Sequence, residues 1–201
     1  MTVNGFYPIV ATVEAAEAVL DAGAQIVQFR YKDFFSRTVF EDAERVAKLC
    51  SAAKAMFVIN DRVDIAALLN AAVHLGQDDL APADARRILP PGAVIGFSTH
   101  NEQQLRAGDQ EPVDYLAIGP IFPTVSKQKP DPLVGLDKLR RLRAVTRKPL
   151  VAIGGITRET AHAVFDAGAD AIAVIGDLYP DPRARAKEWL AICSSHKSLP
   201  R

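Results

Sequence analysis

The sequence has little cysteine, no excess of charge and no long apolar run, and each shortage excludes a class of protein. Its two cysteines, Cys50 and Cys193, are too few for a disulfide framework or a zinc site, so we expect reduced packing residues. The 24 basic and 24 acidic side chains cancel. Nucleic acid is therefore not an expected partner, nor is an anionic membrane, and any phosphate binding must come from locally placed groups.

Long apolar segments are missing as well. The runs at residues 56–59 and 151–153 are far shorter than the ~20 residues that a membrane-spanning helix needs. The amino-terminus lacks a basic stretch followed by an apolar one, which is the pattern of a secretory signal. We therefore expect a soluble, cytoplasmic protein.

The composition that remains is typical of a globular protein, with 49% apolar and 24% charged residues. A folded chain of this length buries about 70% of the surface that its unfolded form exposes, which allows a substantial core. No linker or low-complexity segment divides the chain. We expect a single domain over residues 1–201, with a frayed tail at residues 196–201. The sequence predicts no oligomeric state.

Short apolar runs alternate with segments of helical periodicity along the whole chain. The runs predict strands at residues 6–10, 25–30, 56–60, 73–76, 94–99, 115–119, 150–154 and 171–176. The periodic segments predict helices at residues 13–22, 38–53, 62–69, 82–89, 101–107, 136–145, 158–167 and 182–192. Apolar strands separated by helices form a parallel sheet that is covered on both faces. Eight such units favour a closed (β/α)8 TIM barrel over an open doubly wound sheet.

Polar residues gather where the predicted strands end, and in such a barrel these ends form the catalytic face. The second strand closes with Gln28, Arg30 and Lys32, which share one side of an extended chain because side chains alternate. Two cations and an amide suit a phosphorylated ligand with a hydrogen-bonding heterocycle. A solvated strand end with surface ion pairs is the alternative.

Carboxylates follow the third and fourth strands, at Asp61 and Asp79. Because Mg²⁺ is commonly held by one or two carboxylates together with ligand phosphates, the pair predicts a metal site. Each carboxylate could instead cap the helix that follows it. His74, inside the fourth strand, is interpreted either as a core imidazole bonded to backbone or as a ligand contact.

The loops after the last three strands carry features of a phosphate site. The loop at residues 121–132 contains Thr124, Ser126, Lys127 and Lys129, and these side chains predict a clamp that closes over a phosphate. A disordered surface loop is the alternative. Gly155 and Gly176 follow the seventh and eighth strands, where barrels often bind phosphate on open backbone N–H groups.

Six blocks at predicted strand ends resemble, in order, the thiamine phosphate synthase family. They are VQFRYKD (27–33), INDRVDIA (59–66), VHLGQDDL (73–80), GFSTHN (96–101), YLAIGPIFPTVSK (115–127) and VAIGGIT (151–157). The resemblance covers about residues 6–178. That family is a single β/α barrel that joins hydroxymethylpyrimidine diphosphate to hydroxyethylthiazole phosphate, releasing pyrophosphate with Mg²⁺. The resemblance implies the same transferase activity, the same small-molecule substrates and a Mg²⁺ cofactor.

The resemblance also implies a role for individual residues. Contacts to the pyrimidine diphosphate are implied for Gln28, Phe29, Arg30, Tyr31, Lys32, Asn60, Ser98 and Lys127. Four of these are implied in catalysis, namely Arg30, Lys32, Ser98 and Lys127. The thiazole phosphate would contact Thr124, Val125, Ser126, Gly155, Ile175 and Gly176. Mg²⁺ would bind Asp61 and Asp79.

Some positions depart from the pattern of the family. Tyr31 and Ser126 stand where the family often has glutamate and threonine, and Gly176 replaces a frequent serine. The first loop, residues 11–13, is short and lacks the usual acidic residue. These departures concern substrate details more than the reaction. Two other functions stay open: a metal-independent thiazole tautomerase with His100 as acid or base, and a non-catalytic protein that binds a phosphate ligand.

Overall fold

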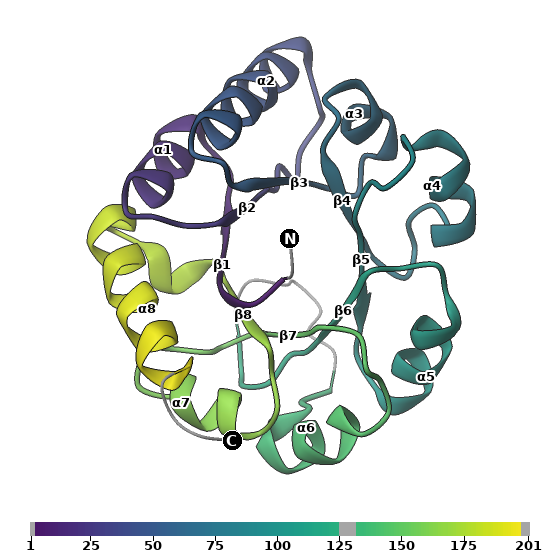
Figure 1. Ribbon diagram of the computed structural model, residues 1–201, viewed down its shortest axis with the longest axis vertical. Coiled ribbons are helices and arrows are strands. Elements are labelled where there is room, and N and C mark those ends of the chain that lie inside the picture. Colours follow the sequence, from purple (N-terminus) through teal and green to yellow (C-terminus); the bar gives the residue numbers. More distant parts are fainter. Residues whose placement is uncertain (1–2, 125–131, 198–201) are drawn as a thin grey trace.

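A closed barrel of eight parallel strands in sequence order lies at the centre of the computed structural model, which describes residues 3–124 and 132–197 (Figure 1). The strands are β1 (Gly5–Val10), β2 (Ile26–Phe29), β3 (Met56–Asn60), β4 (Ala72–Leu75), β5 (Ile95–Thr99), β6 (Tyr115–Ile118), β7 (Leu150–Ile153) and β8 (Ala171–Val174). The ring closes where β1 pairs with β8, with Gly5 opposite Ala171. The predicted (β/α)8 barrel is confirmed.

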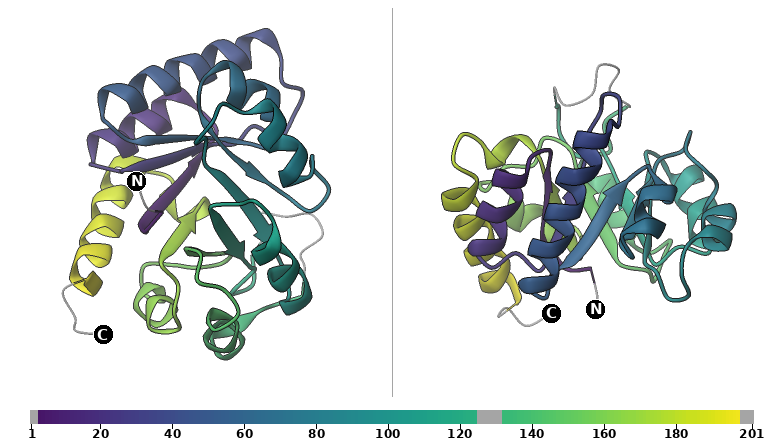
Figure 2. Two further views of the ribbon diagram at one scale, coloured as in Figure 1. Left: turned by 45° about the vertical axis from the view of Figure 1, so that its right-hand side comes forward. Right: turned by 90° about the horizontal axis from the view of Figure 1, so that it is seen from above.

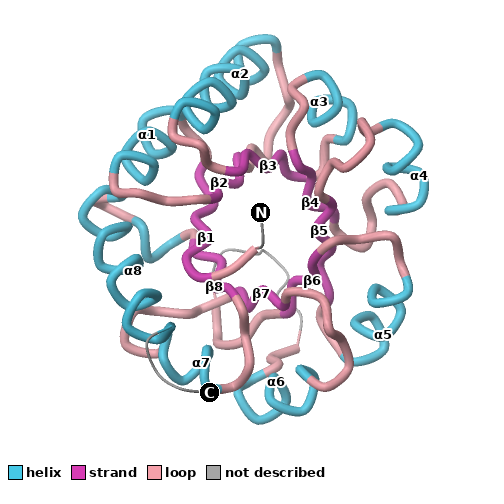
Figure 3. Tube along the Cα trace, viewed as in Figure 1, coloured by secondary structure: helices cyan, strands magenta, loops and turns pink. Residues whose placement is uncertain are grey.

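Helices follow the strands and cover the outside of the barrel (Figures 2 and 3). They are α1 (Val13–Asp21), α2 (Arg37–Ala52), α3 (Val63–Leu68), α4 (Pro82–Ile88), α5 (Glu102–Gln110), α6 (Gly135–Arg143), α7 (Ala161–Asp166) and α8 (Pro182–Lys197), with a short 3-10 helix, η1 (Gly176–Leu178), after β8. Thr12, Ser36 and Asn101 cap α1, α2 and α5 by accepting from first-turn N–H groups. Among the described residues, no helix is long and apolar enough to cross a membrane.

The side chains of the strands pack in two layers. Ile26 and Val58 belong to the smaller apolar cluster, inside the barrel. Their neighbours Val27 and Ile59 belong to the larger cluster, between the strands and the helices. This alternation explains why the strands are apolar on both faces.

Two features at the ends of the chain concern the sequence predictions. Cys50 and Cys193 are free and buried, as expected for packing residues. The helix α8 runs to Lys197, so residues 196 and 197 are helical where a frayed tail was expected. The ring of His196 stacks on that of Phe165, with centroids 4.8 Å apart, and this contact supports the last turn. Residues 198–201 lie outside the described part of the chain.

Candidate active site

The second strand turns alternate side chains to opposite faces of the barrel wall. Gln28 points into the barrel and is 2% exposed. Arg30 comes directly after β2, and its N–H donates to Val10. Tyr31 and Lys32 lie beyond the strand and are exposed. The predicted row of Gln28, Arg30 and Lys32 therefore begins inside the barrel and continues past the carboxyl end of the strand.

Phe29 is a predicted ligand contact, but its side chain does not lie at the mouth of the barrel, which is the end formed by the carboxyl ends of the strands. Its side chain is 2% exposed and packs in the larger apolar cluster, between the barrel and the helices. The reason is the period of two along β2, because Gln28 takes the inward position. The Phe29 side chain therefore points away from the predicted ligand, and a contact from Phe29 stays a prediction for its backbone alone.

Asp61 and Asp79 lie side by side at the mouth. Loss of hydration raises the pKa of Asp61 to about 7, and a hydrogen bond to Asp79 and the charge of that neighbour add to the rise. The charge of Arg30 and a hydrogen bond from Asn60 act in the opposite sense. The backbone of Asp61 has φ 64°, a left-handed conformation that aspartate tolerates better than most residues. Asp79 is held in turn, since its Oδ2 accepts from the N–H of Gly76 at 2.6 Å.

The helix-capping alternative for these two carboxylates is wrong. The helix α3 begins after Arg62 and α4 begins after Ala81, and neither start has a side-chain cap. Two like charges held together are costly unless a proton or a cation lies between them. The described residues contain no cluster of three or more histidine, cysteine, aspartate or glutamate side chains. Two carboxylates with the remaining positions left to water and ligand oxygens fit the way Mg²⁺ is bound.

Arg30 belongs to the same electrostatic group. Desolvation lowers the pKa of Arg30, and the negative charge of Asp61 opposes this change. The nearby Arg62 behaves differently, because it pairs with Asp64 through two hydrogen bonds of 2.8 and 2.5 Å. Arg62 thus forms the kind of surface ion pair that was the alternative interpretation of Arg30. Arg30 instead interacts with the charge of Asp61.

The glycines after β7 are required by packing. Gly154 and Gly155 have φ of 98° and 63°, and a Cβ on Gly155 would overlap the carbonyl of Pro123. The segment after β6 is bound here by backbone, since the N–H of Phe122 donates to Gly154 at 2.9 Å. The start of the loop after β6 therefore lies directly on the turn after β7.

Gly176 is different, because a Cβ built on it meets no atom within 4 Å. It begins η1 directly after Ile175. The next residue, Asp177, anchors this turn by accepting from Trp189 at 2.9 Å and pairing with Arg158 at 3.1 Å. Open space at Gly176 and a fixed backbone suit a phosphate site. Thr124 is half-buried; Val125, Ser126 and Lys127 lie outside the described residues.

A row of hydrogen bonds crosses the barrel below the mouth, and sequence reasoning missed it. Gln28 Nε2 donates to the hydroxyl of Tyr7 at 2.9 Å, and the hydroxyls of Tyr7 and Tyr115 lie 2.7 Å apart. His74 Nδ1 is 2.9 Å from the Tyr115 hydroxyl, and His74 Nε2 is 2.8 Å from Ser98 Oγ. We call these five residues the interior network. Tyrosines within apolar strands were the available signal, because a buried phenol needs a partner.

The two histidines of interest bond to different groups. His74 contacts side chains of the interior network, whereas a backbone bond or a ligand contact was expected from the sequence. Burial lowers the pKa of His74 to about 4, so its ring is neutral near pH 7. His100, the tautomerase candidate, has Nδ1 2.8 Å from the carbonyl oxygen of Gly119. That nitrogen of His100 is engaged in holding the end of β6.

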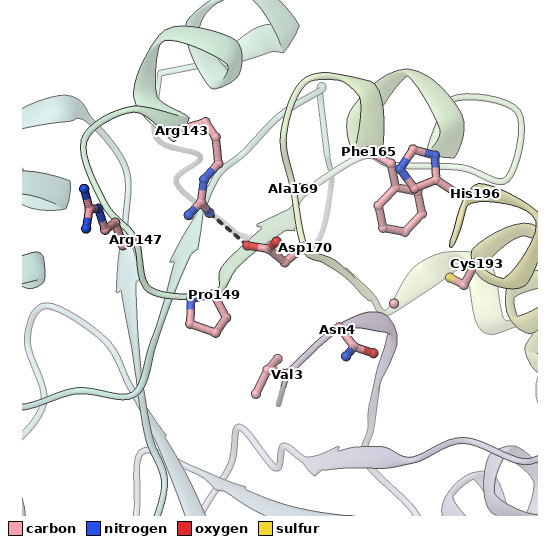
Figure 4. Close-up of a pocket in the computed structure, with 11 residues that line it drawn as sticks. Val3, Asn4, Arg143, Arg147, Pro149, Phe165, Ala169, Asp170, Cys193 and His196 are labelled. Carbon is pink, nitrogen blue, oxygen red and sulfur yellow. Dashed lines mark hydrogen bonds and ion pairs between the residues drawn. The ribbon is translucent and has the colours of Figure 1, made fainter. Parts of the chain in front are cut away.

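A cavity of about 340 Å³ lies at the opposite end of the barrel (Figure 4). It is lined by residues at the amino ends of strands, including Asn4 and Pro149, and by Arg143 and Asp170. Arg143 pairs with Asp170 at 2.8 Å, and Asp170 also accepts from the N–H of Leu150 at 2.9 Å. Because none of the predicted site residues lines it, this cavity is separate from the candidate active site.

Comparisons with known proteins show the family of the chain. A family model described as "Thiamine monophosphate synthase" matches residues 6–178. A thiamine-phosphate synthase from Koribacter versatilis is 48% identical over 190 residues, 94% of this chain and 90% of that protein. One from Rhizobium etli is 37% identical over 203 residues, 99% of this chain and 100% of that protein. A solved thiamine phosphate pyrophosphorylase from Pyrococcus furiosus has 30% identity and a TM-score of 0.87, with 96% of each chain covered. The resemblance stated from the sequence blocks is confirmed.

Proposed function

Because the chain belongs to the thiamine monophosphate synthase family, we propose that it is a transferase that makes thiamine phosphate. Its substrates are hydroxymethylpyrimidine diphosphate and hydroxyethylthiazole phosphate, and its second product is pyrophosphate. The observation that carries this proposal is the family match over residues 6–178, within which the paired Asp61 and Asp79 lie beside Arg30.

The reaction breaks the bond between the pyrimidine methylene carbon and the diphosphate oxygen, and the electron pair leaves with the diphosphate. The thiazole nitrogen then forms a bond to that carbon. No side-chain nucleophile is needed, since the main task is to stabilise charge on the departing diphosphate. Arg30, Lys32 and Lys127 supply positive charge for this task.

The carboxylate pair gives the site its place for a metal. A Mg²⁺ bound by Asp61 and Asp79 would neutralise negative charge on the diphosphate. The chain itself holds these two carboxylates together through the left-handed turn at Asp61 and the bond from Gly76 to Asp79. We include Mg²⁺ as cofactor in the proposal, and we keep the cytoplasmic location predicted from the sequence.

The second substrate is held by its phosphate on the other side of the mouth. Gly155 and Gly176 lie after neighbouring strands, and Gly176 has open space around its Cα. A phosphate bound there fixes the thiazole ring, which turns a collision of two substrates into an oriented step. Thr124, Val125 and Ser126 complete the proposed phosphate contacts, with Ile175 before Gly176.

The test is an assay with both substrates and Mg²⁺, with thiamine phosphate as the detected product. We expect product only when both substrates and the metal are present. Isomerisation of a thiazole phosphate without Mg²⁺ would support the tautomerase alternative. Binding of either substrate without any turnover would support the non-catalytic alternative.

A further inference from the structure

The hydrogens of the interior network can be counted, and the count gives the network a direction. The hydroxyl of Tyr7 accepts a hydrogen from Gln28 Nε2, so its own hydrogen must go elsewhere. The hydroxyl of Tyr115, at 2.7 Å, is its remaining partner in the described residues. Both phenols are 0% exposed, and a buried O–H without an acceptor is costly. Tyr7 therefore donates to Tyr115.

The hydrogens can be assigned in the same way from Tyr115 to Ser98, at the other end of the interior network. Tyr115 accepts from Tyr7, so its hydrogen is directed to His74 Nδ1 at 2.9 Å. Because that nitrogen accepts, the hydrogen of the neutral ring is on Nε2, which donates to Ser98 Oγ at 2.8 Å. The hydroxyl hydrogen of Ser98 is then left to donate to a ligand at the mouth.

The strands are built to allow this row of contacts. His74, Gly96 and Tyr115 are register partners on β4, β5 and β6. A Cβ on Gly96 would overlap the ring of Tyr115, so the glycine lets that ring cross β5 and reach His74. The rings of His74 and Tyr115 stack with centroids 5.5 Å apart.

We propose that the interior network is one oriented row of hydrogen bonds, in which Tyr7, Tyr115 and His74 are positioning residues. The row ties its two ends together. With the amide nitrogen of Gln28 turned to Tyr7, the carbonyl oxygen of Gln28 is the acceptor for a ligand, and Ser98 is a donor. The ligand must bring a donor to one end and an acceptor to the other, as the edge of an aminopyrimidine does. Only this ligand identity rests on the proposed function.

The tautomer of His74 in the substrate-free protein tests the proposal without any assay of activity. Nitrogen NMR of the ¹⁵N-histidine-labelled protein should show His74 with the hydrogen on Nε2, assigned by the signal that His74→Gln removes. Nδ1 of His100, which faces a carbonyl oxygen, is an internal reference for a protonated nitrogen. A hydrogen on Nδ1 of His74 would overturn the proposed direction.

Changing the far end of the network gives a sharper test. Gln28→Glu, measured at alkaline pH, places a carboxylate that only accepts, so every bond in the row should reverse and move the hydrogen of His74 to Nδ1. Gln28→Met removes the amide without adding an acceptor, and the hydrogen should stay on Nε2. An unchanged tautomer in Gln28→Glu would overturn the proposal that the five groups are coupled.

A kinetic measurement asks whether the coupling matters to the ligand. Tyr115→Phe, and Tyr7→Phe as a second variant, should raise KM for the pyrimidine diphosphate about 3- to 10-fold, the range for one hydrogen bond, with a smaller change in kcat. Tyr179→Phe, at an exposed tyrosine, is the matched control. If the two core variants lose thermal stability but keep the wild-type KM, the tyrosines only support the fold and the positioning role is wrong.

Discussion

The pKa of a single carboxylate at the mouth, Asp61, is determined by its neighbours. Asp61 lies within hydrogen-bond distance of Asp79, and burial, together with this contact, raises the pKa of Asp61. We expect Asp61→Asn or Asp79→Asn to lower turnover by ~10²-fold or more, because each removes a ligand of the proposed Mg²⁺, which would neutralise charge on the leaving diphosphate. Steady-state rates across a Mg²⁺ titration measure this effect.

Asp84→Asn is the control for these variants, since Asp84 is an exposed carboxylate in the first turn of α4 that pairs with Arg87. Its turnover and Mg²⁺ dependence should match the wild type. Full activity in either Asp61→Asn or Asp79→Asn at low Mg²⁺ would remove the pair from the proposed metal site.

Gly176 allows a clean test of the phosphate contacts, because its missing side chain leaves open space. Gly176→Val should raise KM for the thiazole phosphate about tenfold or more and leave KM for the pyrimidine diphosphate unchanged, since the added methyls occupy the place of the phosphate. Gly176→Ser, which adds a hydroxyl that can donate to phosphate, should stay within a few-fold of wild type. Equal KM values in Gly176→Val and wild type would exclude the contact. Gly155→Val is unsuitable, because it would displace Pro123.

Pairing between strands controls the interior network at the scale of elements. The ring of Tyr115 passes over Gly96 to reach His74, and this is possible because Gly96 on β5 has no side chain. Gly96→Ala should reduce the free energy of unfolding by about 1–3 kcal/mol, as overpacking of a core does. Denaturant unfolding measures the change. In the double variant Gly96→Ala, Tyr115→Leu the cost of the alanine should shrink, and additive costs would show that the ring is not the obstacle.

Features set by local sequence patterns could be predicted from the sequence, whereas contacts between distant strands could not. Strand positions and the polar mouth follow from local patterns, so the barrel and the neighbourhood of Asp61 and Arg30 could be expected. The meeting of Tyr115 with His74 could not, because it depends on the register of three strands, which hydrophobic pattern alone does not specify. The outward turn of Phe29, by contrast, follows from the alternation along β2, since Gln28 takes the inward position.

The whole barrel separates a reactive end from a structural end. At the mouth, like charges and open glycine backbone are the features on which the proposed cation and phosphate sites rest. At the amino end, charge is matched within the protein, as Arg143 is by Asp170. Between the two ends the interior network places polar groups in the barrel, where each must keep its hydrogen-bond partner.

Burial of this network connects the stability of the whole molecule to pH. Desolvation lowers the pKa of His74 from its ordinary value of 6.5 to about 4, so between these values the unfolded chain binds a proton that the folded chain does not. The contribution of His74 to the free energy of unfolding should therefore fall as the pH drops from 6.5 to 4, by at most about 3 kcal/mol. Above pH 6.5 the contribution is fully present.

His74→Gln isolates this term, because glutamine keeps a donor and an acceptor but does not titrate. Denaturant unfolding of both proteins at several pH values gives the free energy of unfolding as a function of pH. The two curves should converge as the pH falls, because only in the wild type does the unfolded chain gain a proton at residue 74 that the folded protein does not bind. The carboxyl of Asp61 acts in the opposite sense over this whole range, because its pKa is raised from 3.8 to about 7, but it is present in both proteins. Curves that stay parallel from pH 7 to 4 would show that His74 takes up its proton in the folded barrel without cost.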